Sequence, residues 1–312
     1  MIFALLVLTI FSTVTISHIG LTVSNSVKKL PIYSVDTKDK KIAITFDFFT
    51  KICYYIYSLP CVKGGGTACG GRIVKQRSIK MEFLSRTEML FGKENVEKLK
   101  NKKVIVFGIG GVGGYVCEAL ARTGIGTIDL VDNDTVSVSN INRQIIALHS
   151  TVGRYKTEVM KERVLDINPS CNVNIFNTFY TPEASSQFDF SFYDYIVDAI
   201  DTVSGKIELV LQAEKSNTPI IASMGTGNKL NPCGFKVADI YKTSVCPLAR
   251  VMRTELKKRG VKKLKVVYSE EAPVSAFTEN ADNGKRIPAS CAFTPSVAGL
   301  IIASEVIKDL IK

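Results

Sequence analysis

The chain has 312 residues, enough for one large or two modest domains, and its hydrophobic fraction of 46% is ordinary for a globular protein. A formal net charge of +11 favours an anionic partner such as nucleic acid, although a generally basic cytosolic protein has the same balance. The eight cysteines form no C-x-x-C pair, which argues against a redox dithiol, a ribbon-type zinc site and a disulfide framework.

The first 80 residues differ from the rest. Residues 1–16 are an apolar run without a preceding basic residue, similar to the hydrophobic region of a signal peptide or to a short membrane anchor. Residues 30–47 resemble the opening of polysaccharide deacetylases, but the match stops at Asp47, and the chain's two histidines cannot complete that family's metal site. We therefore expect residues 1–80 to lie outside the main fold, as a fused remnant or a mis-assigned start; a membrane-tethering extension is the alternative.

From residue 81 the pattern becomes regular and predicts one domain over residues 81–312. Five short β-branched runs predict strands, at residues 104–107, 127–131, 173–176, 195–199 and 219–223. Four segments have helical character, at residues 95–100, 112–122, 156–167 and 206–215. Strands alternating with helices predict an α/β fold with a Rossmann-like, doubly wound, mostly parallel sheet. Ligands of such sheets bind at the carboxyl ends of the strands.

A glycine cluster follows the first of these strands and opens the next helix. The cluster has five glycines, of which Gly108, Gly110, Gly111 and Gly113 are predicted to bind the nucleotide and Gly114 is the fifth. Such a loop brings the backbone close to phosphate oxygens and places a helix N-terminus against them, but it does not separate ATP from NAD. Asp132 ends the second strand, 21 residues after Gly111. An acidic residue there reaches the ribose hydroxyls of a nucleotide; a turn cap is the alternative.

A polar loop then adds basic and amide groups beside the predicted phosphate site. It contains Ser139, Asn140, Asn142 and Arg143, and Lys156 follows at the start of a helix. A nucleotidyl-transfer enzyme needs such cations, because charge builds on the α-phosphate and the leaving pyrophosphate. The pattern favours ATP over NAD, with a solvated basic face as the alternative for Arg143 and Lys156.

Two aspartates close the fourth strand. Asp201 lies just past the strand, where a carboxylate opposite a triphosphate is a natural Mg²⁺ ligand, whereas Asp198 is expected to be partly buried. We assign the metal to Asp201 and place Thr202 beside it in the nucleotide site. A helix N-cap is the alternative role for Asp201.

In this order, the motifs resemble those of the ubiquitin-activating-type adenylating superfamily, the ThiF/MoeB-like proteins, over residues 85–312. The resemblance implies that Gly111, Asp132, residues 139–143, Lys156 and Asp201 contact ATP or its Mg²⁺. Arg86 lies six residues before Gly92. In the superfamily an arginine at this spacing reaches the phosphates of a dimer partner, so the resemblance implies a homodimer.

Within the superfamily, the segments SRTEMLFG, HSTVGRYKTEVMKERVLDINP and FTPSVAGLIIASEVIKDL are most similar to the tRNA threonylcarbamoyladenosine dehydratase group. This resemblance implies a cytoplasmic enzyme that adenylates the carboxylate of N6-threonylcarbamoyladenosine in tRNA and then cyclises it. Zinc-bearing relatives have two C-x-x-C pairs where this chain has only Cys246 and Cys291, so no structural zinc is expected. The basic residues of segment 250–265 would guide the tRNA backbone, or form a solvated helix face.

Three other functions stay open. Adenylation of a ubiquitin-like sulfur-carrier protein would add a sulfur acceptor as partner, but the late crossover loop, residues 269–290, has none of the cysteines that carrier-modifying relatives use there. An NAD oxidoreductase fits the glycine loop but not the set of Arg143, Lys156 and Asp201. A membrane-tethered binding module would use residues 1–16.

Overall fold

The structure, a computed structural model, describes residues 33–37, 40–44, 82–274 and 288–312. The chain divides into two compact units, Met1–Lys75 and Gln76–Lys312. In the first unit the described residues form an antiparallel hairpin of β1 (Tyr33–Thr37) and β2 (Lys40–Ile44). The apolar run at residues 1–16 lies outside the described residues. Among the helices that are described, none is both long and apolar enough to cross a membrane.

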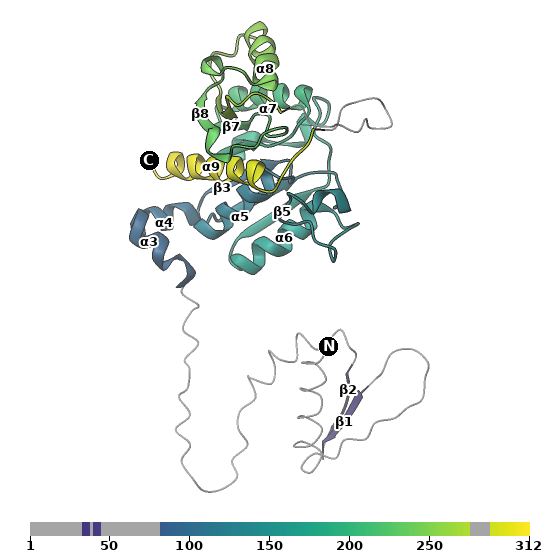
Figure 1. The fold of residues 1–312 in the computed structure, drawn as a ribbon. Helices are drawn as coiled ribbons and strands as arrows, with labels where there is room; N and C mark the ends of the chain where they lie inside the picture. Colours follow the sequence, from purple (N-terminus) through teal and green to yellow (C-terminus); the bar gives the residue numbers. More distant parts are fainter. Residues whose placement is uncertain (1–32, 38–39, 45–81, 275–287) are drawn as a thin grey trace. The chain divides into compact units, whose positions relative to one another are not determined.

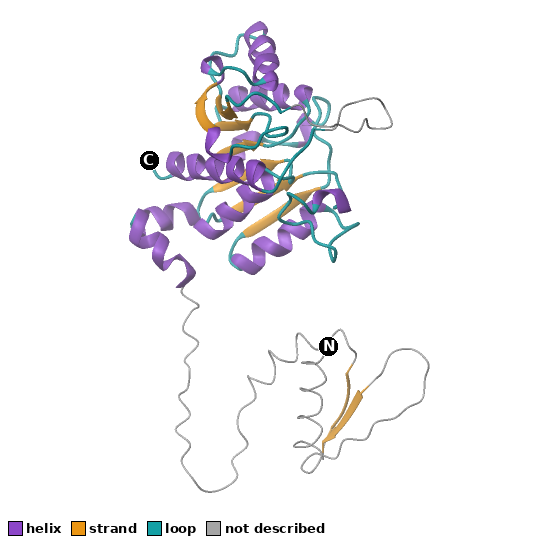
Figure 2. Cartoon of the chain, in the orientation of Figure 1, coloured by secondary structure: helices purple, strands orange, loops and turns teal. Residues whose placement is uncertain are grey.

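One seven-stranded sheet forms the centre of the second unit (Figures 1 and 2). Its strands, in spatial order, are β5 (Asn172–Phe176), β4 (Thr127–Val131), β3 (Lys103–Phe107), β6 (Tyr195–Asp198), β7 (Ile220–Ser223), β9 (Lys265–Ser269) and β8 (Phe235–Asp239). All neighbours pair in parallel except β8, which runs antiparallel to β9. Strand order reverses beside β3, which confirms the predicted doubly wound, mostly parallel α/β sheet.

Helices cover both faces of this sheet, as the continuous apolar runs of the strands require. Val104 and Val106 of β3 pack in a cluster with residues of α5 (Gly113–Thr123), α6 (Lys156–Ile167) and α9 (Phe293–Leu310). The opposite face carries α7 (Val203–Ser216) and α8 (Pro247–Lys258). Two short helices, α3 (Ser85–Phe91) and α4 (Lys93–Lys100), precede the sheet. The remaining helical segments are 3₁₀ turns: η2 (Glu82–Leu84), η3 (Val138–Asn140), η4 (Ser185–Gln187), η5 (Phe190–Phe192), η6 (Pro232–Gly234) and η7 (Ile240–Lys242).

An aromatic cluster takes the place of a helix over part of the α7 face. Phe107 of β3 contacts the ring of Tyr180 edge-on, at a centroid distance of 4.8 Å, and Phe188 in the same way at 5.4 Å. Phe190 stacks on Phe107 from the same segment. This packing fixes the loop after β5 against the carboxyl end of β3, which is where a nucleotide would bind.

Candidate active site

A cavity of about 340 Å³ lies at the carboxyl ends of β3, β4 and β6. Nine of the residues predicted from the sequence line it: Gly108, Gly110, Gly111, Asp132, Asn140, Arg143, Lys156, Asp201 and Thr202. Parallel strands end at the same sheet edge, which is why positions up to 94 residues apart in sequence meet here. The sequence therefore located the cavity, and the structure shows how each side chain enters it.

Four helices begin at this cavity. Val112 is the N-cap of α5, Lys156 is the first residue of α6, and Thr202 is the N-cap of α7. Pro295, in the first turn of α9, completes the lining. Unpaired N–H groups and the positive end of the helix dipole favour anions at each of these positions. Four such ends around one cavity suit a ligand that carries several phosphate charges.

Close approaches of the backbone explain two glycines of the loop. Gly108 has φ +87°, and a Cβ there would lie 2.7 Å from the Ala199 carbonyl oxygen of the neighbouring strand end. A Cβ on Gly113 would lie 1.7 Å from the Gly108 carbonyl oxygen. Gly113 therefore lets α5 start directly against the loop and does not line the cavity.

Asp132 joins the glycine loop to the end of β4. One carboxylate oxygen accepts a hydrogen bond from the Ile109 N–H at 2.6 Å, and the other accepts from the Asp134 N–H at 2.8 Å. Burial raises the pKa of Asp132, while the Lys156 charge and these two N–H groups oppose the rise. Each carboxylate oxygen keeps a further lone pair, so ribose hydroxyls can still donate to it.

Lys156 is buried within the cavity wall rather than on a solvated face. Its side chain is 7% exposed, and its Nζ donates to the Asp134 carboxylate at 2.7 Å. Arg143 lies over the glycine loop, with its Cγ 3.5 Å from where a Gly111 Cβ would be. Its guanidinium donates to the Ser139 carbonyl at 2.8 Å and to the Asn142 side-chain oxygen at 2.9 Å. Both cations thus face the cavity, held by neighbouring acceptors.

Asp201 is exposed at the cavity mouth and does not cap α7, because the N-cap is Thr202. The turn that carries it rests on a buried ion pair. Asp198 and Lys206 are both fully buried at 2.9 Å, and Lys206 also donates to the Ile200 carbonyl at 3.0 Å. Burial raises the pKa of Asp198, and the Lys206 ammonium counters it. Asp198 therefore supports the turn that carries Asp201.

Besides Gly113, three predicted residues lie outside the lining of the cavity: Ser139, Asn142 and Arg86. The Ser139 hydroxyl bonds Ser137, and the Asn142 amide donates to the Ser290 carbonyl at 3.0 Å. They shape the polar loop, because Arg143 also bonds both residues. Arg86 is exposed on α3 and is absent from the lining of its own chain's cavity. This placement agrees with a reach toward another molecule.

The structure adds two lining residues that sequence reasoning did not single out. Gln144 is 7% exposed, and its amide oxygen is buried without a hydrogen-bond partner. The Tyr180 hydroxyl is likewise buried and unpartnered, and burial raises its pKa. Gln144 follows Arg143 directly, which was the available signal; Tyr180 sits in a loop with no recognisable pattern. Unpartnered buried polar atoms are costly, so they mark where a ligand is accommodated.

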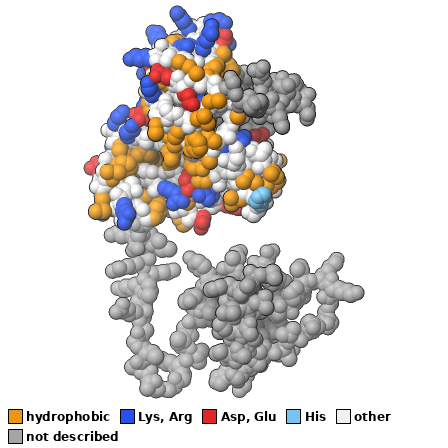
Figure 3. Space-filling model, viewed as in Figure 1, with side chains coloured by type: hydrophobic (Ala, Val, Ile, Leu, Met, Phe, Trp, Pro, Cys, Tyr) orange, Lys and Arg blue, Asp and Glu red, His pale blue; other side chains and the backbone are white. Residues whose placement is uncertain are grey.

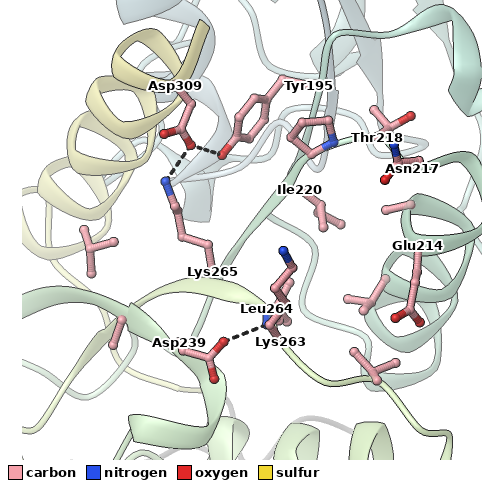
Figure 4. A pocket seen from close by; sticks show the side chains of 16 residues that line it. Tyr195, Glu214, Asn217, Thr218, Ile220, Asp239, Lys263, Leu264, Lys265 and Asp309 are labelled. Atoms are coloured by element: carbon pink, nitrogen blue, oxygen red, sulfur yellow. Dashed lines mark hydrogen bonds and ion pairs between the residues drawn. The ribbon is translucent and has the colours of Figure 1, made fainter. Parts of the chain in front are cut away.

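A larger cavity, about 660 Å³, lies at the opposite, amino ends of β6, β7 and β9 (Figure 4). Three of its polar side chains, Asp309, Lys265 and Tyr195, bond one another. Asp309 accepts from Lys265 Nζ at 2.5 Å and from the Tyr195 hydroxyl at 2.8 Å. Burial raises the pKa of Asp309, but the hydrogen bonds from Lys265, Lys312 and Tyr195 outweigh it and lower the value to about 2. This cavity lacks the convergent helix N-termini that would bind a triphosphate.

The cysteines show no metal-binding arrangement among the described residues. Cys246 is buried as the N-cap of α8, and Cys291 lies 3.3 Å from the Thr294 hydroxyl. No group of three or more His, Cys, Asp or Glu side chains in the described part of the chain is placed to hold a metal ion. The expectation of no structural zinc stays a prediction.

The arrangement of the site agrees with a comparison against known families. The model of the ThiF family matches residues 84–312. The chain belongs to the ThiF family. As a family member it is similar, at 46% identity over 239 residues, to the tRNA threonylcarbamoyladenosine dehydratase of Bacillus subtilis, a match that covers 73% of this chain and 94% of that protein. This match places the chain with the dehydratase group of the family.

Two further similarities bear on the site of this ThiF-family chain. The crystal structure of E. coli tRNA N6-threonylcarbamoyladenosine dehydratase, TcdA, in complex with ATP is 35% identical, with a TM-score of 0.68, and the match covers 74% of this chain and 94% of that one. An adenylyltransferase and sulfurtransferase, UBA4, of Vanderwaltozyma polyspora is 38% identical over 139 residues, covering 44% of this chain and 31% of that protein. The match thus covers nearly the full length of these two dehydratases but only part of the sulfurtransferase.

Proposed function

We propose that this protein is an ATP-dependent tRNA threonylcarbamoyladenosine dehydratase. The observation that carries the proposal is the match along 94% of a dehydratase at 46% identity. The cavity supports it, because Asp132, Arg143, Lys156 and Asp201 converge where four helices begin. An ATP complex of a similar structure supports ATP as the nucleotide.

In the first step, the threonine carboxylate of the modified adenosine attacks the α-phosphorus of ATP, and the bond to the β-phosphate breaks. Pyrophosphate leaves and an acyl-adenylate remains. Asp132 holds the ribose, while Arg143 and Lys156 bind the phosphates and stabilise the charge that builds on them. The N–H groups of the glycine loop and of α5 orient the chain of phosphates.

In the second step, the carbamoyl group of the same substituent closes onto the activated carbonyl. The bond to AMP breaks, AMP leaves, and the substituent gives up a proton, so the nucleoside loses one water overall. Ring closure is intramolecular and needs no protein nucleophile. The chain's part is to hold the adenylate and keep water away from it.

Mg²⁺ fits the residues of this cavity. The Asp201 carboxylate is exposed at its mouth with no hydrogen bond or ion pair within the described chain, and Mg²⁺ commonly takes one or two carboxylates plus phosphate oxygens. We propose that Asp201 holds the ion. When bound, Mg²⁺ neutralises the charge of the triphosphate and of the leaving pyrophosphate.

A homodimer and a cytoplasmic location complete the proposal. Arg86, exposed on α3, would reach the phosphates bound by a second copy of the chain. The cytoplasm follows from tRNA as substrate. Residues 1–80 would lie outside the catalytic domain.

Adenylation of a ubiquitin-like sulfur carrier is the second candidate function. It is favoured by the shared adenylating core of the UBA4 match, but that match covers 44% of this chain. A sulfur-acceptor partner would then be required, and ATP–pyrophosphate exchange would depend on that protein rather than on tRNA.

The test is to incubate the full chain with ATP, Mg²⁺ and tRNA carrying threonylcarbamoyladenosine, and to weigh the nucleosides by mass spectrometry. The expected product has lost one water. Asp201→Asn should lower turnover at least a hundredfold, because removal of a charge-stabilising group costs on the order of 3 kcal/mol. Unchanged nucleoside mass with the wild-type chain would refute the dehydratase, and normal turnover by Asp201→Asn would refute the metal assignment.

A further inference from the structure

Helix α8 and the residues after it carry most of the net positive charge of the chain. Residues 247–265 contain eight basic side chains and one acidic side chain, so this segment holds +7 of the net charge of +11. Figure 3 shows Lys and Arg side chains gathered at the end of the molecule where Figure 1 places α8. A segment with so high a density of positive charge favours binding of an anionic partner.

Half of these cations already have partners within the chain. Arg253 donates to the Thr243 carbonyl at 2.9 Å, Lys258 and Arg259 pair with Glu255, and Lys265 pairs with Asp309 and Glu305. The other four are exposed with no hydrogen-bond or ion-pair partner among the described residues: Arg250, Lys257, Lys262 and Lys263. We name these four the basic ridge. Their heads are free to bind an anion.

Helix α8, which carries Arg250 and Lys257 of the basic ridge, begins beside the catalytic cavity. Cys246 Sγ and Leu248 Cβ each lie 4.0 Å from where a Cβ on Gly225 would be, and Gly225 directly precedes Thr226 of the cavity lining. From that edge the 12 residues of α8 extend about 18 Å. Arg250 and Lys257 are seven residues apart, two helical turns, and so share one face. Arg250 and Lys257 thus follow one another along a helix that begins beside the cavity.

We propose that the basic ridge binds the phosphate backbone of the RNA whose modified adenosine enters the cavity; this inference rests on the proposed function. The apolar face of α8 is already used, because Ala249, Met252 and Leu256 are buried in a core cluster. An anionic membrane surface would need an apolar face as well as charge, and α8 has none left to insert. A nucleic-acid backbone binds through positive charge alone and needs no apolar face, so it suits the basic ridge best.

The experiment compares two variants of the full chain from which the same amount of charge is removed. The ridge variant carries Lys257→Gln, Lys262→Gln and Lys263→Gln, which leaves Arg250 and the cavity intact. The control variant carries Lys93→Gln, Lys98→Gln and Lys215→Gln, three exposed lysines on α4 and α7 that also lack partners in the described chain. Binding of unmodified tRNA is measured from 50 to 200 mM salt, alongside ATP affinity and turnover of modified tRNA.

The ridge variant should bind tRNA at least tenfold more weakly than the control variant, with a salt slope smaller by about 2 to 3, because each removed lysine no longer neutralises a phosphate. Its KM for modified tRNA should rise while its kcat and ATP affinity stay unchanged. Equal tRNA binding by the two variants would overturn the inference, as would a ridge-dependent affinity for phosphatidylserine vesicles that exceeds the affinity for tRNA.

Failure of the proposed function has a different signature. If the wild-type chain does not convert modified tRNA, the dehydratase is refuted; a ridge-dependent decrease in tRNA affinity would then still support the RNA surface. If the wild-type chain converts the substrate and the ridge variant does so with an unchanged KM, the dehydratase stands and the ridge is refuted.

Discussion

Gln144 is a side chain of the cavity with a buried polar atom that has no hydrogen-bond partner. Its amide oxygen is buried without a partner, and its amide nitrogen lies 3.8 Å from where a Gly110 Cβ would be, next to the phosphate loop. A buried polar group without a hydrogen bond costs about 1–3 kcal/mol. Such a cost is tolerated at a site that a ligand completes, because strain of this kind collects where binding occurs.

Gln144→Leu should therefore separate stability from activity. The unfolding free energy should stay the same or rise by about 1 kcal/mol, since an unpaired amide is replaced by an apolar group of similar size. Turnover should fall about tenfold, because the amide oxygen can accept from a hydroxyl or amine of the bound nucleotide, and a buried donor that loses its acceptor costs about 1–3 kcal/mol. Urea unfolding and nucleoside mass measure the two effects.

Gln187→Leu, at an exposed glutamine away from the cavity, is the matched control and should change neither quantity. Full turnover by Gln144→Leu would show that the unpaired amide has no part in binding.

Residue types and spacing were enough to find most of the cavity, but not the partners of its charges. Asp132, Arg143 and Asp201 follow motifs that are local in sequence. The Lys156–Asp134 pair spans 22 residues, and it forms because β4 ends beside the start of α6. Lys206 sits in an ordinary helical stretch, and only the fold shows that it is fully buried against Asp198. Pairings set by tertiary structure leave no local pattern to predict them.

At the scale of elements, five of the seven strands of the sheet were predictable from the sequence, and β8 and β9 were not. The predicted bounds of β3, β4, β5, β6 and β7 agree with the structure to within one residue. Buried parallel strands read as continuous apolar runs, which explains this agreement. β8 is an edge strand whose Lys236 and Val237 are exposed, and β9 begins inside the basic run, residues 250–265, for which a solvated helix face was the alternative interpretation. In fact α8 ends at Lys258, and Gly260 follows with φ +79°.

Helix α3 is an element that its own chain does not bury. It contains no buried residue, and Met89 and Leu90 are 87% and 78% exposed. They lie three and four residues after Arg86, on the same side of the helix. An apolar face beside an exposed arginine suits packing against a second copy of the chain.

Met89→Glu combined with Leu90→Glu should convert the proposed dimer into a monomer and abolish turnover, because Arg86 would no longer reach the partner's phosphates. Sedimentation velocity measures the mass of the particle, and the nucleoside mass measures the turnover.

Mixing inactive Arg86→Ala and Asp201→Asn chains should restore about a quarter of wild-type activity, since half of the dimers would be mixed and each would have one intact site. A monomeric wild-type chain, or a mixture that stays inactive, would exclude a role for Arg86 across the dimer.

At the scale of the whole molecule, two findings support the proposal that the catalytic part begins near residue 80. The chain divides between Lys75 and Gln76, and the ThiF family model begins at residue 84. Leu84 is fully buried, and its side chain packs 2.8 Å from where a Cβ on Gly124 would be, at the end of α5. The fold of the second unit is therefore anchored from residue 84 onward, close to Met81, the start that the sequence pattern predicts.

A chain that begins at Met81 should therefore keep its fold and its activity. Gly108 is the first residue in the sequence that lines the catalytic cavity, so removal of residues 1–80 deletes none of the lining residues. The melting temperature should stay within about 2 °C of that of the full chain, and turnover of modified tRNA should change less than twofold, because the domain keeps its buried core intact. A chain that begins at Thr87 is the matched comparison: without Leu84 its core lacks a fully buried leucine, which costs about 2–5 kcal/mol, and it should melt several degrees lower. If the chain from Met81 is as unstable as the chain from Thr87, residues 1–80 belong to the catalytic fold.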